Sequence, residues 1–187
     1  ATPPPRAALL PHIWLSDEEI RQGQRLLEQL PDKAGTPPIA LHPYATHPDK
    51  AWKEAYWRQL MELFESRGIP WIVIGRGNGM EGIPASRNFT NRTSLRETCA
   101  LLKSSSLLIT GDSGPMHLAG AVGTPVLALF GPTTEEWGFF PAGPKDRVLE
   151  SQLDCRPCTL HGKKHCDRNH ACMQSITPEQ VMRALDE

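Results

Sequence analysis

The sequence has 187 residues, 39% of them hydrophobic, which is enough to bury the core of one domain. Twenty lysines and arginines stand against 21 aspartates and glutamates, so a net charge of −1 argues against a nucleic-acid-binding surface. No apolar run approaches the roughly 20 residues that span a bilayer, which excludes a transmembrane segment.

Apolar runs and amphipathic stretches alternate along the chain, and capping signals mark several boundaries. Residues 2–5 are rich in proline, so we expect residues 1–15 to be a linker remnant and residues 16–187 to form one domain. In chain order we expect a helix over about 16–30, a strand over 38–42, a helix over about 51–67, strands over 71–74 and 88–91, a helix over 94–103, a strand over 107–109, a helix over 115–122, strands over 126–130 and 147–150, and a helix over about 178–185. This alternation predicts an α/β fold with a Rossmann-like, doubly wound parallel sheet.

The stretch over residues 105–133 carries the strongest functional signal. It is typical of a strand, a tight polar turn over 111–114, a helix that begins at Pro115, and a second strand. Such a unit places the backbone N–H groups of the turn, together with Asp112 and His117, at the carboxyl edge of the sheet. Open α/β folds bind their ligands at that edge.

The turn over 111–114 allows three interpretations. Asp112 and Ser113 could simply cap the following helix. The N–H groups, the Ser113 hydroxyl and the helix dipole could instead bind a diphosphate. Ser113 could also be a hydrolase nucleophile with Asp167 and His170 as its partners. We favour the anion site, because the hydrolases with Gly-Asp-Ser carry it near the chain start or on an all-β fold.

Two further loops follow strands at the same edge. Lys50 lies where we expect the helix over 51–67 to begin, so its ammonium group and the helix N–H groups could hold a phosphate together. Thr46 and His47 share that loop. The glycine-rich loop over 75–79 matches neither the dinucleotide fingerprint nor the Walker motif, so an ordinary turn and a ligand loop are both open.

A specific resemblance begins in the motif Asp112-Ser-Gly-Pro-Met-His117-Leu-Ala, followed by Gly123-Thr-Pro and Leu129-Phe-Gly-Pro-Thr133. This pattern is similar to that of the heptosyltransferases, the ADP-heptose:lipopolysaccharide glycosyltransferases. The resemblance extends over about residues 38–187 and includes Lys50-Ala-Trp52, Thr93-Ser-Leu95 and Cys155-Arg-Pro-Cys158. It implies one half of a GT-B fold: the C-terminal domain that binds the nucleotide sugar, without the N-terminal acceptor domain.

The resemblance also implies a donor site, whose expected members are Thr46, Lys50, Glu81, Thr93, Asp112, Ser113, Gly114 and His117. Thr46 and Lys50 would contact the diphosphate, while the turn over 112–114 and His117 would surround the phosphate and the sugar. Thr93 would lie near the nucleoside. Glu81 is the nearest candidate for the acidic residue that binds the ribose in the family.

For the full-length protein, the resemblance implies inverting transfer of heptose from ADP-heptose to the lipopolysaccharide inner core, without a metal or other required cofactor. The general base of the family lies in the N-terminal domain. We therefore expect no catalytic residue in this fragment, which would bind the donor weakly and be inactive alone. The full-length protein would be cytoplasmic, with a peripheral position at the inner membrane left open.

Four of the five cysteines lie within residues 155–172, which favours a reducing compartment over a secreted disulfide framework. Their spacing permits a structural four-thiolate zinc site, with mixed ligation by histidine as a variant; the residues concerned are Cys155, Cys158, Cys166 and Cys172, with His161, His165 and His170 between them. A reduced, metal-free loop is the alternative. A zinc-stapled interaction module and the Ser113 hydrolase thus remain as alternative functions, and Cys99 is expected in the core.

Overall fold

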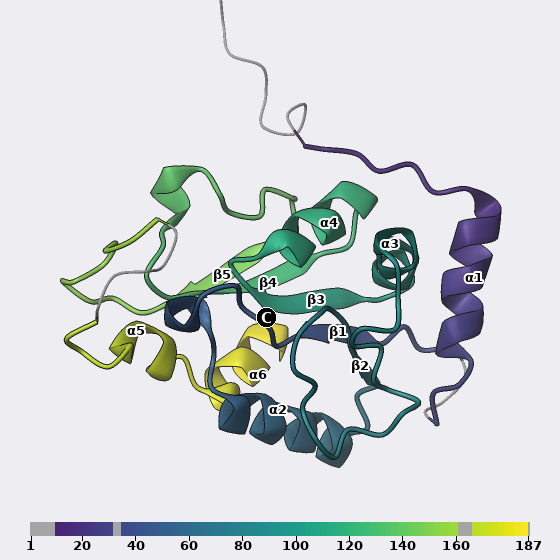
Figure 1. Cartoon of the computed structure of the whole chain (residues 1–187), viewed down its shortest axis with the longest axis horizontal. Coiled ribbons are helices and arrows are strands. Elements are labelled where there is room, and N and C mark those ends of the chain that lie inside the picture. The colour runs from purple at the N-terminus through teal and green to yellow at the C-terminus, as the bar shows by residue number, and fades with distance from the viewer. Residues whose placement is uncertain (1–9, 32–34, 161–165, 187) are drawn as a thin grey trace, which may run out of the picture.

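Five parallel strands form the centre of the molecule in the order β2-β1-β3-β4-β5, as a computed structural model of residues 10–31, 35–160 and 166–186 shows (Figure 1). The strands are β1 (Ile39–His42), β2 (Trp71–Val73), β3 (Leu107–Gly111), β4 (Val126–Phe130) and β5 (Arg147–Glu150). Every residue of β1, β2 and β4 is buried, as expected of a parallel sheet that is covered on both faces. The predicted α/β class and doubly wound parallel sheet are therefore confirmed.

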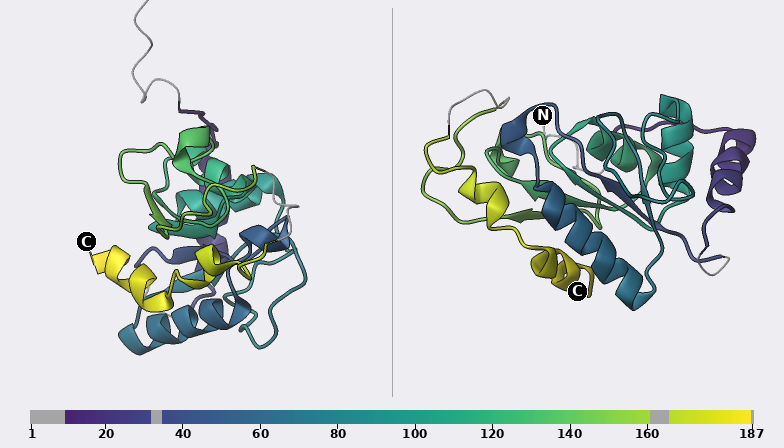
Figure 2. Two further views of the ribbon diagram at one scale, coloured as in Figure 1. Left: turned by 90° about the vertical axis from the view of Figure 1, so that its left-hand side faces the viewer. Right: turned by 60° about the horizontal axis from the view of Figure 1, so that its bottom comes forward.

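The helices cover the two faces of the sheet unequally (Figures 1 and 2). The two that pack side by side on one face are α2 (Glu54–Arg67) and α6 (Pro178–Asp186). The other face carries α3 (Leu95–Lys103) and α4 (Gly114–Val122), with α1 (Asp17–Leu27) packed against the outer side of α3. A short helix, α5 (Ala171–Gln174), and two 3₁₀ turns, η2 (Pro48–Lys50) and η3 (Glu135–Trp137), complete the described elements.

Alternation of side chains along the strands divides the core in two. Ile39 and Leu41 of β1 pack with α2 and α6, whereas Ala40 between them packs with α3 and α4. Trp57 and Phe64 fill the first core from α2, and both are fully buried. The sheet is thus held from both sides, which fixes the loops at its carboxyl edge.

The strand order places a topological switch point between β1 and β3. From β1 the chain passes through α2 to β2 on one side, then crosses back through α3 to β3 on the other side of β1. The connections therefore diverge beyond the carboxyl ends of β1, at His42, and of β3, at Gly111. Sheets of this kind bind their ligands in the crevice at such a point.

Several predicted boundaries need correction. The helix expected over 51–67 begins at Glu54, because residues 51–53 do not continue the helix and Trp52 lies in the core, where its Nε1 donates to Ile176 O at 2.8 Å. The first helix ends at Leu27 rather than about residue 30. The strand expected over 88–91 is a single bridge between Val73 and Asn88, since Asn91 has a positive φ of 58° that extended strands do not adopt.

Of the linker predicted over residues 1–15, residues 1–9 lie outside the described part of the chain. In the remainder, the N–H of Ile13 donates to Ala121 O of α4 at 2.9 Å, and the side chains of Ile13 and Leu15 pack against the core beneath α3 and α4. These residues therefore attach α1 to the domain. No helix within the described ranges is long and apolar enough to cross a membrane.

Candidate active site at the switch point

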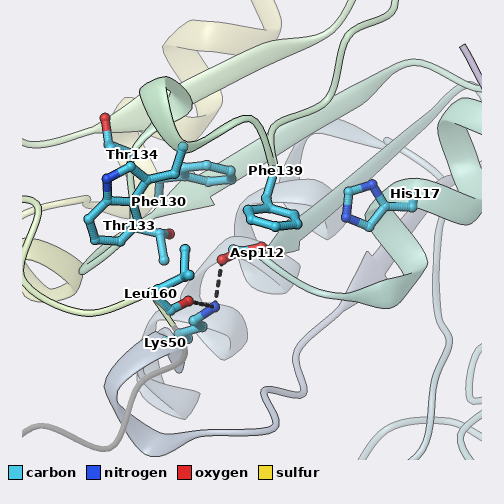
Figure 3. A pocket seen from close by; sticks show the side chains of 9 residues that line it. Lys50, Asp112, His117, Phe130, Thr133, Thr134, Phe139 and Leu160 are labelled. Carbon is cyan, nitrogen blue, oxygen red and sulfur yellow. Dashed lines mark hydrogen bonds and ion pairs between the residues drawn. The ribbon is translucent and has the colours of Figure 1, made fainter. Parts of the chain in front are cut away.

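The loop after β1 and the turn after β3 meet through an ion pair between Lys50 and Asp112. The Lys50 Nζ donates to Asp112 Oδ2 at 2.6 Å, and the two side chains are only 14% and 11% exposed. The same Nζ donates to the carbonyl oxygen of Leu160 at 3.2 Å, so three segments distant in sequence converge on this amine (Figure 3). A partly buried, charge-assisted contact of this kind fixes the lysine in one place.

The sequence predicted that Lys50 lies at the start of a long helix, and the structure contradicts this. Lys50 ends the three-residue turn η2, and α2 begins only at Glu54. A single 3₁₀ turn offers no useful dipole, so a phosphate beside Lys50 would depend on the amine and on the N-terminus of α4. Gly111 lets the backbone of Lys50 pack closely against the end of β3, because a Cβ at position 111 would lie 3.3 Å from the Lys50 carbonyl oxygen.

The N-terminus of α4 is open on its polar side. Ser113 is the N-cap residue and is extended, but its side chain makes no capping hydrogen bond. Its Oγ instead lies 2.9 Å from Thr110 Oγ1 and 3.3 Å from His42 Nδ1. Ser113 thus occupies the N-cap position, but the interpretation that its side chain caps the helix is wrong. The exposed N–H of Gly114 has no side-chain cap, and an anion can approach it.

His42 is a member of the site that the sequence interpretation missed. It ends β1, is 6% exposed, and its Nδ1 lies 3.0 Å from Thr110 Oγ1. Burial lowers the pKa of His42 to about 4, so its ring is neutral at physiological pH. The one local signal was a polar residue at the end of a strand whose other residues are all apolar.

Two cavities flank residues 112–117, which run from the end of β3 into the first turn of α4. The first, of about 120 Å³, is lined by Lys50, Asp112, His117, Phe130, Thr133, Thr134, Trp137, Phe139 and Leu160 (Figure 3). The second, of about 440 Å³, is lined by His42, Tyr44, Ala45, Thr46, Gly75, Arg76, Thr93, Leu95, Thr98, Ser113, Gly114, Pro115 and Leu118. The structure therefore brings seven of the eight predicted donor-site residues to the walls of two adjacent cavities.

The first cavity combines charged groups with exposed aromatic rings. Phe139 is 53% exposed and lines this cavity together with Asp112, and Trp137 of η3 also lines it. Thr133 is 4% exposed, and its buried hydroxyl has no hydrogen-bond partner among the described residues. A buried hydroxyl in a cavity wall is available to hydrogen-bond a ligand or a water that enters the cavity.

Glu81 is the predicted residue that the structure does not bring to either cavity. It is exposed, and its carbonyl oxygen accepts a hydrogen bond from Arg58 Nη1 at 2.9 Å. Arg76, earlier in the same loop, lines the second cavity instead. The loop after β2 thus presents a cation to the cavity where the family resemblance suggested an acidic residue.

The glycines of that loop have a packing role that the sequence left open. A Cβ at Gly75, whose φ is +118°, would lie 2.5 Å from the His42 ring. At Gly77 it would lie 2.4 Å from the Tyr44 ring. The side-chain amide of Asn91 fixes this turn. Its Oδ1 accepts from the Gly77 N–H at 3.2 Å, and its Nδ2 donates to the Gly77 carbonyl oxygen at 2.8 Å. The loop therefore packs closely against the rings of His42 and Tyr44, and its glycines are required for this contact.

The hydrolase interpretation required Ser113 to meet His170. In the structure, His170 Nε2 lies 2.8 Å from Asp49 Oδ1, and Asp167 belongs to the same turn as His170. Ser113 has hydrogen bonds to His42 and Thr110 instead. The structure therefore contradicts the alternative in which Ser113, His170 and Asp167 form a catalytic triad.

The cysteine loop lies partly outside the described residues, with His161 and His165 among those left out. Cys155, Cys158 and Cys166 are partly exposed, Cys172 is buried, and none of the four forms a disulfide within the described part of the chain. Among the residues that the structure describes, no three potential ligands are placed to hold a metal ion. The zinc site stays a prediction, which metal analysis of the purified chain would test. Cys99 is buried in the core, as predicted.

Comparisons with known proteins agree with this geometry. The model of glycosyltransferase family 9 (heptosyltransferase) matches residues 11–167. Lipooligosaccharide heptosyltransferase 2 of Campylobacter jejuni is 33% identical over 150 residues, which are 71% of this chain and 44% of that protein. Lipopolysaccharide heptosyltransferase 1 of Pseudomonas aeruginosa is 35% identical over 153 residues, which are 74% of this chain and 40% of that protein.

The fold also has solved counterparts. The structure of E. coli ADP-heptose LPS heptosyltransferase II has a TM-score of 0.73 at 24% identity, and the match covers 99% of this chain and 54% of that one. At this identity the likeness concerns the fold. The chain spans about half the length of the relatives that it matches.

Proposed function

Because this chain belongs to glycosyltransferase family 9, the heptosyltransferases, we propose that it is the donor-binding half of an enzyme that transfers heptose from ADP-heptose to the lipopolysaccharide inner core. The observation that carries the proposal is Lys50 Nζ, held 2.6 Å from Asp112 beside the open N-terminus of α4. A cation and an uncapped backbone N–H, that of Gly114, at a switch point are suited to a diphosphate.

The two cavities suggest how such a donor would lie. We propose that the diphosphate spans the turn over 112–114, in reach of Lys50 and the Gly114 N–H. The adenosine would enter the larger cavity, past Thr46 and Thr93, and the sugar would enter the smaller one beside His117. This arrangement uses every predicted donor-site residue that lines a cavity.

In the transfer itself, these residues would act on the leaving group. As the bond between the anomeric carbon and the phosphate oxygen breaks, negative charge grows on ADP. Lys50 and the N-terminus of α4 would stabilise that charge more strongly in the transition state than in the bound donor. The Asp112 carboxylate would hold the lysine in place during this change.

The remaining functions would belong to a domain that corresponds to the half of the relatives that this chain does not match. We propose that a partner domain binds the lipopolysaccharide acceptor and provides the general base that deprotonates its hydroxyl. Attack opposite to the departing ADP would invert the anomeric centre, and we propose that this step needs no metal or other cofactor. We propose that the full-length enzyme is cytoplasmic; a peripheral position at the inner membrane would bring it to such an acceptor.

Titration of the chain with ADP by isothermal calorimetry tests the proposal. The wild type should bind ADP, and Lys50→Ala should weaken binding at least about tenfold, because a charge-assisted contact to phosphate is lost. Lys53→Ala is the matched control, since Lys53 is exposed and bonds Gln174 instead. The proposal would be overturned if well-folded protein shows no binding of ADP, or if the two lysine variants bind ADP with equal affinity.

A further inference from the structure

Three polar side chains beneath the N-terminus of α4 form a closed hydrogen-bonded triangle. His42 Nδ1 lies 3.0 Å from Thr110 Oγ1 and 3.3 Å from Ser113 Oγ, and the two hydroxyl oxygens are 2.9 Å apart. Thr110 is fully buried, His42 nearly so, and Ser113 borders the larger cavity. His42 borders the same cavity, but of the two hydroxyls in this triangle only that of Ser113 does so and can meet a ligand directly.

One set of hydrogen-bond directions accounts for every contact of the triangle. The carbonyl oxygen of Gly111 lies 3.1 Å from Thr110 Oγ1 and can only accept, so the Thr110 hydroxyl can donate its one proton there. Toward His42 and Ser113, Thr110 Oγ1 then accepts. In this arrangement His42 carries its ring proton on Nδ1, and this nitrogen does not take the proton of Ser113.

We propose that His42 is a positioning residue for the donor phosphate: its Nδ1–H donates to Thr110 Oγ1 and Ser113 Oγ, which leaves the Ser113 hydroxyl proton for the phosphate oxygen. In the free protein that proton rests on Thr110 Oγ1. When the anion arrives, the hydroxyl rotates toward it while its oxygen stays anchored by His42. This inference rests on the proposed function, because it names how one contact to the diphosphate is set.

The surroundings of His42 hold its ring in this orientation. The Tyr44 ring meets it edge-on, with centroids 5.7 Å apart, and the Tyr44 hydroxyl is fixed by Thr90 Oγ1 at 2.7 Å. On the side of Nε2, the backbone of Gly75 approaches so closely that no side chain fits there. The loop after β2 and the Tyr44 ring thus pack against the imidazole, whose Nδ1 is directed at the two hydroxyls.

The proton position can be measured without any ligand. In the ¹⁵N NMR spectrum of the labelled chain, the His42 signals, assigned by their loss in His42→Asn, should show a protonated Nδ1 and an unprotonated Nε2 at pH 7. Ser113→Ala should shift the Nδ1 resonance. A proton on Nε2 would overturn the inference, whatever the chain binds.

A double-mutant cycle on ADP affinity tests the positioning role. His42→Phe keeps the ring but loses the donor, so it should weaken ADP binding about fivefold, in the range of one hydrogen bond. His42→Asn, whose amide nitrogen can take the place of Nδ1, should retain most of the affinity, whereas His42→Gln, which imitates Nε2, should not. In a Ser113→Ala background, His42→Phe should cost nothing further.

The outcomes separate this inference from the proposed function. If the wild type fails to bind ADP, the proposed function falls and the NMR measurement alone decides the role of His42. If ADP binds but the effects of His42→Phe and Ser113→Ala simply multiply, His42 does not act through Ser113 and the inference is wrong. Thermal melting of each variant confirms that the compared proteins are folded.

Discussion

Thr133 is a residue whose hydroxyl costs stability unless something binds it. The hydroxyl is buried in the wall of the smaller cavity without a partner among the described residues. Thr133→Val keeps the shape and removes the unpaired group, so the free energy of unfolding should stay equal or rise by about 1 kcal/mol. Affinity for ADP-heptose should fall several-fold while affinity for ADP stays unchanged. Urea unfolding and calorimetry measure the two effects, and an equal loss for both ligands would contradict a sugar contact.

His42 should make the stability of the chain depend on pH. Its pKa is about 4 in the folded chain against 6.5 ordinarily, so between these values the unfolded chain binds more protons. The stabilisation is complete above about pH 6.5 and is lost as the pH falls toward 4. From pH 7 to 4.5 the wild type should lose about 2 kcal/mol more than His42→Asn. Urea midpoints at both pH values measure this, and carboxylates such as Glu19 cancel in the difference.

Lys50, Asp112, Ser113 and His117 could be found in the sequence because they lie in short motifs after strands. His42 and Thr133 could not be found in that way. Their significance comes from contacts or from a missing contact in three dimensions: His42 meets Ser113 across 71 positions of the chain. A sequence pattern records what is near in the chain, and these residues act through what is near in space.

At the scale of elements, two glycines inside helices should respond oppositely to alanine. A Cβ at Gly23 of α1 would lie 2.6 Å from the Ala100 carbonyl oxygen of α3, so Gly23→Ala should separate the two helices and destabilise the fold by about 1–3 kcal/mol. Gly120 of α4 has nothing within 4 Å, and Gly120→Ala should stabilise by about 1 kcal/mol through helix propensity. Chemical denaturation of the two variants measures both changes in the free energy of unfolding. Changes of the same sign in the two variants would refute the packing argument.

The elements themselves were predictable where local chemistry determines them. Both capping boxes form as expected, with Ser16 bonded by the N–H of Glu19 and Ser94 by that of Glu97. The prediction failed at the start of α2, because burial of Trp52 in the core outweighs the helical preference of its neighbours. The helical periodicity of a sequence does not reveal tertiary contacts of this kind.

At the scale of the whole molecule, donor binding should stabilise the entire domain, since the site joins segments from both faces of the sheet. With ADP at 100 times its dissociation constant, the free energy of unfolding should rise by about 2.7 kcal/mol. For a domain of this size, that corresponds to a melting temperature about 5–10 °C higher. Scanning calorimetry measures the shift. Lys50→Ala at the same ADP concentration should show a much smaller one, and an identical shift would place ADP elsewhere.

The pairing of Lys50 with Asp112 has a consequence for how a ligand would reach the site. Opposite charges 2.6 Å apart act as a dipole, whose field falls off with distance much faster than that of a lone ammonium group. The pair thus adds little long-range attraction for an anion, and the chain as a whole carries a net charge of only −1. Association with a diphosphate should then owe little to electrostatic steering by this lysine, whose charge is felt only once the phosphate is in contact.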